Sequence, residues 1–531
     1  MRSPQSVLAA LVLVAGGGVT LAESPGKLSP TPPAFTTPLL TAEQVGRSVE
    51  SLDNIVGTAM ERTGVPGIAV AVVYRDQVLY SRGYGVREVG YQAPIDTDTV
   101  FQLASISKPI ASTVVAALVG RGLADWSDPV RDHLPFFVLS DPFVTAKVTI
   151  ADLLSHRSGI YTASGDLLED LGYDRAYIMA HLRMQPLDSF RSSYNYSNFG
   201  FTLGAEAAAA AAGTAWEDLA RSQLFAPLGM TRSSYRHADY AAHKNRARLH
   251  VRQEGTGSPV WVAQHDRQPD AQAPAGGASG SIRDLTQFMR LQLAGGRFEN
   301  VEVVDHVALA FTHTPQVVPS LPRTPLSRAG FYGLGWNVTY DDRGRLEISH
   351  AGAFYLGAST YLIMIPGEQL GIAVLTNGMP IGVPEGIART FLDTVENGHP
   401  TVDWFTLFEQ VFAGMWAADA AGFSYGERPA DVQQPQALSG YTGIYANAYY
   451  GPADISVKDG MLEMTMGPHG ARKTMTLAPH DGDTFSFQPV GENAVTRAGV
   501  AFQRDPNGQI AKMIIDYYDR NGLGTFVRDP G

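Results

Sequence analysis

Ser105 and Lys108 are a pair of residues in this sequence that could perform chemistry together. They open an apolar segment, 110–118, which we predict to be a buried helix. Residues three apart lie on one face of a helix, so the lysine amine can reach the serine hydroxyl, and burial lowers the pKa of that amine toward the strength of a base. The pattern Ser-x-x-Lys is also common by chance. A helix N-cap serine followed by a surface lysine is the alternative, which Pro109 in a first helical turn leaves open.

A second group of polar side chains, Tyr196-Ser197-Asn198, stands just before an alanine-rich helical segment, and we expect a loop to present it. A phenol beside an ammonium group has a lowered pKa and can carry a proton between the serine and a leaving group. Asn198 can hydrogen-bond a substrate amide. Tyr194 competes for the role of Tyr196, and only its lack of an Asn two residues later argues against it.

The third candidate group is His350-Ala351-Gly352, which follows a strand predicted over the preceding five residues. The two small residues would let a substrate lie along the strand edge. The backbone amides of Ala353 and Ser105 could together donate to an oxyanion. We expect His350 to face this site, although a histidine at the end of a strand also commonly serves the structure alone.

The elements that must position these groups are strands at both ends of a catalytic unit, with a helical region between them. Two runs rich in β-branched and aromatic residues, 67–74 and 77–84, predict a hairpin. Residues from about 101 to 293 alternate helix-like segments with loops rich in Gly, Pro and Ser, which predicts a helical subdomain. Strand patterns return at 336–340, 345–349, 358–365 and 369–376. Because the hairpin and the later strands can form one antiparallel sheet, we predict an α+β fold.

The remaining segments lie at the two ends of the chain. Residues 1–22 begin with Arg2 and continue with an apolar run that ends in small residues, which predicts a signal peptide cleaved after Ala22. A membrane anchor is the alternative, but the run is shorter than the roughly 20 residues that a spanning helix needs. We therefore expect an exported protein, periplasmic or secreted. The predicted segments are a signal peptide (1–22), a Pro-rich linker (23–40), a catalytic domain (41–400), a helix with a connector (401–437) and a small β barrel or curved sheet (438–531).

The composition excludes several classes of function. The 531 residues are 44% hydrophobic and 17% charged, which is typical of a globular protein with two or more folded units. A formal net charge of −12 disfavours nucleic acid partners and stable membrane association. The absence of cysteine excludes disulfides, cysteine nucleophiles and thiolate metal sites. No His-Glu-x-x-His or paired His/Asp motif occurs, so we expect no metal and no cofactor.

The order Ser-x-x-Lys, Tyr-x-Asn, His-x-Gly resembles that of the serine β-lactamase and penicillin-binding protein superfamily, in its class C and carboxylesterase-like branch. Segments 149–159 and 274–281 add to the resemblance, which covers about residues 45 to 390; His156 in the first segment looks structural. The C-terminal domain resembles a lipocalin-like module attached to some peptidases and esterases of this family. The resemblance implies an acyl-enzyme mechanism, with catalytic residues Ser105, Lys108, Tyr196 and His350 and substrate-binding residues Asn198, Gly352 and Ala353.

The sequence departs from true β-lactamases at His350, where those enzymes carry the lysine of Lys-Thr-Gly. A titratable group thus replaces a permanent cation. Family members with His-x-Gly are more often D-aminopeptidases, esterases and other peptidases than efficient β-lactamases, and some similar bacterial enzymes cleave linearised cyclic peptides.

We therefore expect a serine peptidase or amidase that acts on small or unusual peptides, either D-residue-containing or linearised cyclic ones. A carboxylesterase that acts on small esters is one alternative, and a non-catalytic penicillin- or peptidoglycan-binding protein is another. The sequence leaves open the oligomeric state and whether the C-terminal domain lids the site.

Overall fold

The structure is a computed structural model that describes residues 39–530, except for 254–259, 265–266, 323, 422–424, 427 and 495. The predicted signal peptide, and the predicted linker up to residue 38, lie outside the described residues. Within the described residues, no helix combines the length and the apolar character needed to cross a membrane.

An eight-stranded antiparallel sheet forms the centre of the first domain, and its strand order is β2-β1-β14-β13-β12-β11-β10-β9. The N-terminal hairpin pairs with the late strands through β1 and β14, where Val70 lies opposite Val374. The α+β fold predicted from the strand patterns is therefore confirmed. The strands are β1 (Gly67–Tyr74), β2 (Gln77–Gly85), β9 (Val317–Ser320), β10 (Gly330–Tyr332), β11 (Asn337–Tyr340), β12 (Leu346–Phe354), β13 (Ala358–Ile365) and β14 (Leu370–Thr376).

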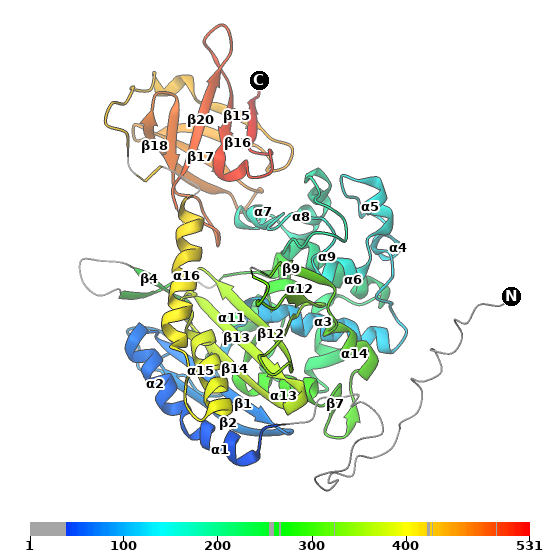
Figure 1. The fold of residues 1–531 in the computed structure, drawn as a ribbon. Helices are drawn as coiled ribbons and strands as arrows, with labels where there is room; N and C mark the ends of the chain where they lie inside the picture. Colours follow the sequence, from blue (N-terminus) through cyan, green and yellow to red (C-terminus); the bar gives the residue numbers. More distant parts are fainter. Residues whose placement is uncertain are drawn as a thin grey trace, which may run out of the picture. The chain divides into compact units, whose positions relative to one another are not determined.

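Helices cover both faces of this sheet (Figure 1). Helices α1 (Ala42–Glu50), α2 (Leu52–Thr63) and α15 (Val383–Asn397) pack against the face that buries alternate β1 residues such as Val70, while Ala71 faces the opposite core. Every residue of β1 is buried for this reason. Helix α1 begins with a capping box, in which the Thr41 side chain accepts from the Gln44 amide.

The helical region between the two groups of strands carries the Ser105 and Tyr196 motifs. Helix α3 (Ser107–Gly120) is buried from Ser107 to Leu118, as its apolar sequence predicts, and α9 (Asn198–Ala211) packs beside it. The other helices of the region are α4 (Val130–His133), α5 (Pro142–Lys147), α6 (Ile150–Leu154), α7 (Asp166–Asp170), α8 (Arg175–His181), α10 (Trp216–Ala220), α11 (His237–Ala242), α12 (Ala273–Gly276), α13 (Ile282–Leu293) and α14 (His306–Thr312). Two-stranded ladders join β3 (Val100–Gln102) to β6 (Ser279–Ser281), β4 (His250–Gln253) to β5 (Val260–Ala263) and β7 (Arg297–Phe298) to β8 (Val301–Glu302).

Helix α16 (Trp404–Ala421) leads to a closed antiparallel barrel of eight strands, drawn in orange and red in Figure 1. Buried side chains fill its interior, among them Tyr441, Phe485 and Phe502, whose rings meet edge to face. The predicted small barrel is therefore confirmed, and its interior is a packed core. Its strands are β15 (Gly443–Ala446), β16 (Ala453–Lys458), β17 (Met461–Met466), β18 (Lys473–Asp481), β19 (Thr484–Phe487), β20 (Ala498–Arg504), β21 (Ile510–Ile515) and β22 (Thr525–Arg528).

Candidate active site

Ser105 lies on the tight turn that joins β3 to α3, within a short 3₁₀ segment, Ala104–Ile106. Ala104 adopts a left-handed backbone, with φ of 48°, which is costly for a residue that carries a side chain. The Ser107 hydroxyl donates to the Ala104 carbonyl oxygen at 2.5 Å and accepts from the Ala278 amide at 2.8 Å. The turn is therefore held in place by its own helix and by the segment that precedes β6, and it leaves Ser105 partly exposed.

Lys108 brings its amine to Ser105 from the first turn of α3, as the three-residue spacing predicts. Its Nζ donates to Ser105 Oγ at 3.1 Å, to Asn198 Oδ1 at 2.8 Å and to the Ala275 carbonyl oxygen at 3.0 Å. Lys108 is completely buried, so the alternative of a surface lysine after an N-cap serine is wrong.

Burial lowers the pKa of Lys108 to about 7; a nearby Asp166 carboxylate opposes this shift and Arg267 adds to it. A lysine with this pKa is an uncharged amine in a large fraction of molecules at neutral pH. Lys108 can therefore accept the Ser105 proton, which an ordinary lysine cannot do efficiently.

Tyr196, from the second motif, contacts the same serine oxygen. Its hydroxyl donates to Ser105 Oγ at 2.9 Å. We expected the neighbouring ammonium to lower the pKa of Tyr196, and this expectation is wrong. Burial raises that pKa, and the hydrogen bond to Ser105 offsets the rise only in part. Tyr196 is therefore a neutral phenol that can donate its proton to a leaving group.

Asn198 is the first residue of α9 and lies beside the lysine, where its Oδ1 accepts from Lys108 Nζ at 2.8 Å. Ser197 caps this helix by accepting from the Gly200 amide at 3.1 Å, so the Tyr-x-Asn motif is a loop that ends in a helix start. Tyr196 and Asn198 therefore reach the Ser105 and Lys108 side chains from one short, well-anchored segment.

Strand β12 continues through the third motif to Phe354, beyond the end predicted for it. Strand β11 pairs only with Leu346–Ser349, and past Ser349 the strand runs beside the Ser105 turn. A Cβ added to Gly352 would lie 2.4 Å from the Leu103 carbonyl oxygen and 3.1 Å from the Ser105 amide nitrogen, so only glycine allows this approach.

His350 is buried behind this strand edge and contacts Tyr332, a residue that no sequence motif had indicated. Its Nδ1 donates to the Ala351 carbonyl oxygen at 2.6 Å, so its Nε2 is left to accept from the Tyr332 hydroxyl at 3.1 Å. Burial and the Lys108 charge lower the pKa of His350 to about 3. The His350 and Tyr196 ring centroids are 6.4 Å apart.

His156 and Tyr194 lie in an aromatic cluster beneath Tyr196. The His156 ring centroid is 4.5 Å from that of Tyr196 and 5.8 Å from that of Tyr194, and its Nδ1 accepts from the Ser197 amide at 3.2 Å. Burial holds the pKa of His156 well below its usual value. His156 therefore packs against the Tyr-x-Asn loop as a neutral ring.

A cavity of about 400 Å³ opens onto Ser105 and Tyr196, and the C-terminal part of the chain contributes to its wall. Ala351 and Ala353 line it from β12. The barrel supplies Glu492, Asn493 and Arg520, so the C-terminal domain contributes to the wall of this cavity. The cavity is lined by Ser105, Thr162, Ala163, Asp166, Tyr196, Asn198, Arg267, Gln272, Ala351, Ala353, Phe354, Tyr355, Asp419, Glu492, Asn493 and Arg520.

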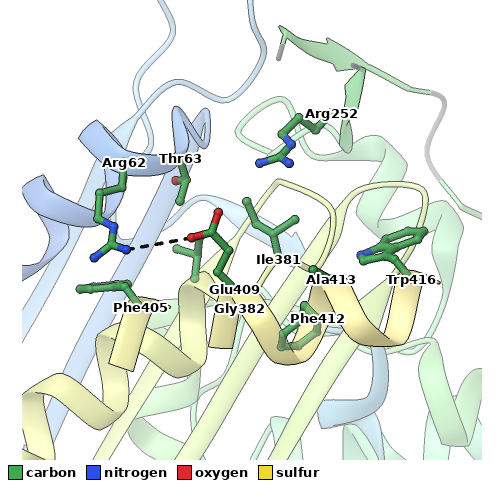
Figure 2. A pocket seen from close by; sticks show the side chains of 11 residues that line it. Arg62, Thr63, Arg252, Ile381, Gly382, Phe405, Glu409, Phe412, Ala413 and Trp416 are labelled. Atoms are coloured by element: carbon green, nitrogen blue, oxygen red, sulfur yellow. Dashed lines mark ion pairs between the residues drawn. The ribbon is translucent and has the colours of Figure 1, made fainter. Parts of the chain in front are cut away.

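A smaller cavity, of about 120 Å³, lies along α16 (Figure 2). Phe405, Phe412 and Trp416 line it, and Arg62 on its rim faces Glu409 at 4.0 Å. None of its lining residues belongs to the three motifs, so the candidate reaction belongs to the larger cavity.

Comparisons with known proteins show the family of the chain. The sequence model described as Beta-lactamase matches residues 52–394, which hold all three motifs. The chain belongs to the Beta-lactamase family. A second model, described as a domain of unknown function (DUF3471), matches residues 427–523, which include the barrel strands up to β21.

By their names, the relatives of this Beta-lactamase family chain include both penicillin-binding proteins and enzymes. Penicillin-binding protein 4 of Amycolatopsis lactamdurans is 31% identical over 337 residues, 62% of this chain and 83% of the relative. The D-alanyl-D-alanine-carboxypeptidase/endopeptidase AmpH of Escherichia coli is 22% identical over 326 residues, 60% of this chain and 81% of AmpH. The octameric penicillin-binding protein homologue of Pyrococcus abyssi superposes with a TM-score of 0.56 at 18% identity, covering 90% of this chain and all of that one.

A loop of the barrel, residues 491–493 between β19 and β20, is held at the cavity of this Beta-lactamase family chain by a buried carboxylate. Asp170 in α7 accepts from the backbone amides of Glu492 and Asn493 at 2.8 and 3.2 Å, and from Asn493 Nδ2 at 2.9 Å. Glu492 accepts from the Tyr355 amide and faces Arg267 at 3.5 Å. These contacts join the barrel to the cavity wall directly.

Gly491 makes this contact possible, and replacing it tests whether the loop matters for catalysis. Its φ is 100°, and an added Cβ would lie 2.2 Å from Asp170 Cγ. Gly491→Ala should therefore lower kcat/KM by about tenfold, because the loop moves away from the cavity. Gly508→Ala is the matched control, since Gly508 also has a positive φ, of 80°, but an added Cβ there meets nothing within 4 Å. Equal kcat/KM for both variants would show that the loop contact is unimportant.

The pKa of Lys108 predicts how reactivity depends on pH. The amine must be uncharged to accept the Ser105 proton, so the rate of Ser105 labelling by a fluorophosphonate should rise with pH and level off above about 7. His350, with a pKa of about 3, cannot cause a rise of the labelling rate near pH 7. A labelling rate that stays constant from pH 5 to pH 9 would contradict the role of Lys108 as base.

Proposed function

We propose that this Beta-lactamase family serine hydrolase forms an acyl-enzyme on Ser105 and acts as a peptidase or amidase on small peptides. The observation that carries the proposal is that Ser105 Oγ lies within hydrogen-bond distance of both a buried amine and a buried phenol, Lys108 Nζ at 3.1 Å and Tyr196 OH at 2.9 Å. The two groups supply the base and the acid that amide cleavage requires.

The reaction proceeds in two stages at this site. Lys108 takes the Ser105 proton while Oγ attacks the substrate carbonyl carbon, and the backbone amides of Ser105 and Ala353 receive the developing oxyanion. The carbonyl carbon–nitrogen bond then breaks as Tyr196 protonates the leaving nitrogen. The Lys108 ammonium, whose Nζ is 4.5 Å from the Tyr196 ring centroid, stabilises the transient phenolate. Water then attacks the ester carbonyl carbon and gives a proton to the Tyr196 phenolate, and the bond to Ser105 Oγ breaks as Oγ takes back its proton from the Lys108 ammonium.

Peptides are favoured over esters as substrates for two reasons. An amide nitrogen is a poor leaving group until it is protonated, and this chain holds a neutral phenol at the serine oxygen to supply that proton. The relative AmpH is named a D-alanyl-D-alanine-carboxypeptidase/endopeptidase. We infer that the substrates are small or unusual peptides, with D residues or a linearised cyclic backbone, and that the chain belongs to the His-x-Gly branch of the family with a lipocalin-like C-terminal domain.

We also propose that the protein is exported, because the N-terminal residues have the pattern of a cleaved signal peptide. Expression of the full chain with its own N-terminus, followed by mass spectrometry of the secreted or periplasmic fraction, tests this. We expect a new N-terminus at Glu23. Protein that remains in the cytoplasm with Met1 in place would contradict export.

The experiment that tests the function is a substrate profile of the purified protein and of Ser105→Ala. The library contains D- and L-peptides, p-nitrophenyl esters and penicillins, and intact-mass spectrometry follows the acyl-enzyme. We expect peptide turnover that Ser105→Ala abolishes. Turnover of esters alone would identify a carboxylesterase, and stable acylation by penicillin with no turnover of any substrate would identify a penicillin-binding protein; either result contradicts the proposal.

His350 predicts poor activity on β-lactams. A penicillin carries a carboxylate, and the imidazole of His350 is uncharged at any working pH because its pKa is about 3. His350→Lys should therefore raise kcat/KM for penicillin relative to a neutral peptide by about tenfold at pH 6, where even a lysine buried as fully as Lys108, with a pKa of about 7, is protonated and attracts the carboxylate. His350→Gln, which stays neutral, is the control. Wild-type turnover of penicillin equal to that of the best peptide would overturn this prediction.

A further inference from the structure

We propose that Asp166 is a positioning residue for this reaction: it holds the Asn198 side chain so that the Asn198 carbonyl oxygen faces Lys108. Asp166 is the first residue of α7 and belongs to none of the three motifs. The inference rests on the proposed function, because it concerns the amine that serves as base there.

Asn198 bridges the carboxylate and the amine through its two amide ends. Its Nδ2 donates to Asp166 Oδ2 at 3.1 Å, and its Oδ1 accepts from Lys108 Nζ at 2.8 Å. An ionised carboxylate can only accept hydrogen bonds, so the amide must present its NH₂ to Asp166 and its oxygen to Lys108. The reversed amide would direct its oxygen at the carboxylate, where no hydrogen bond can form, and its NH₂ at Lys108, where it would occupy the lone pair that an uncharged amine needs to accept the Ser105 proton.

Packing alone gives no reason for an acid at this position. Asp166 is 7% exposed, and its second oxygen, Oδ1, is buried with no hydrogen-bond partner among the described residues. Leaving a buried acceptor unpaired costs stability, and such costs are typical of positions retained for function. Among the described residues, the one hydrogen bond of the Asp166 side chain is the one that orients Asn198.

The negative charge of Asp166 also affects the pKa of the Lys108 amine. The carboxylate opposes the lowering of the Lys108 pKa by burial, so its removal should lower that pKa further. The charged and titratable groups that interact electrostatically with Asp166 are Glu169 and Asp170 on α7, Arg267 from the loop after β5, Lys108, and the tyrosines Tyr196, Tyr449 and Tyr517. Burial raises the pKa of Asp166 to about 7, and Arg267 opposes this rise. Asp166 is therefore an anion in part of the molecules at neutral pH.

The test measures fluorophosphonate labelling of Ser105 from pH 5 to pH 9 in Asp166→Asn and Asp166→Ala. The asparagine can still accept from Asn198 Nδ2 but carries no charge. In this variant we expect the rise of the labelling rate with pH to move to lower pH by about 0.5 unit, with the rate at pH 9 within about threefold of wild type. The alanine variant should show the same shift and also lose about tenfold to a hundredfold in rate at pH 9, because Asn198 is no longer oriented.

Asp170→Asn is the matched control, since it removes a buried carboxylate one turn further along α7 that contacts the barrel loop. The pH at which its labelling rate rises should stay that of wild type, whatever the rate itself. A pH 9 rate in folded Asp166→Ala equal to that of Asp166→Asn would overturn the positioning role. A profile that does not move in folded Asp166→Asn, or that moves equally in Asp170→Asn, would overturn the charge effect. If Asp166→Ala fails to fold, Asp166→Leu, which is close to aspartate in size and accepts no hydrogen bond, replaces it in the same comparison at pH 9. Failure of the proposed function would show differently, as labelling that persists in Ser105→Ala.

Discussion

Replacing Ser105 or Lys108 with alanine is expected to lower turnover by roughly 10⁴-fold or more in each case. The first change removes the nucleophile, and the second removes the one amine within hydrogen-bond distance of it among the described residues, at 3.1 Å. Because the two side chains act as a unit, the double variant should be no slower than either single variant. Single-turnover kinetics with the best peptide measure this directly.

The control for Lys108→Ala must separate lost chemistry from lost packing. Lys108 is completely buried, and its removal leaves the Ala275 carbonyl oxygen and Asn198 Oδ1 without their lysine donor. Lys108→Met keeps most of the side-chain volume and should be as inactive as Lys108→Ala but more stable to heat. Near-wild-type turnover in folded Ser105→Ala protein would remove the basis of the whole assignment.

The sequence predicted the parts of the fold that depend on local patterns. The hairpin 67–84 and the later strands are found where the patterns of β-branched and aromatic residues placed them. Strand β12 was predicted to end at Ser349, because Ala-Gly-Ala lacks the β-branched residues typical of strands. Pairing with β13 extends it to Phe354, and this tertiary contact overrides the local preference.

The candidate site was predictable where its residues form spaced motifs. Asp166, Tyr332 and Glu492 carry no such signal, since each reaches the site from a segment whose approach depends on the folded chain. The pKa of Tyr196 was wrongly predicted for a related reason. The sequence shows a lysine nearby, but it does not show that Tyr196 and Lys108 are both buried and that the lysine is partly uncharged.

Tyr196→Phe is expected to lower turnover of peptides by about 10²- to 10⁴-fold, the usual contribution of a positioned proton donor. The phenylalanine ring would still lie near Lys108 Nζ, which is 4.5 Å from the Tyr196 ring centroid, and would still pack on His156. Only the hydroxyl that contacts Ser105 Oγ is lost. The defect should be smaller for a p-nitrophenyl ester, because p-nitrophenolate leaves without being protonated.

Tyr194→Phe is the matched control, because Tyr194 is two residues away and its ring contacts the same aromatic cluster, 5.8 Å from His156 and 5.4 Å from Tyr332. Its hydroxyl is not needed in the proposed reaction, so turnover should stay within about threefold of wild type. If Tyr194→Phe is the damaging change and Tyr196→Phe is mild, the proton donor has been assigned to the wrong tyrosine. If both are mild for peptides while Ser105→Ala is inactive, the leaving nitrogen receives its proton from Lys108, and one amine serves as both base and acid.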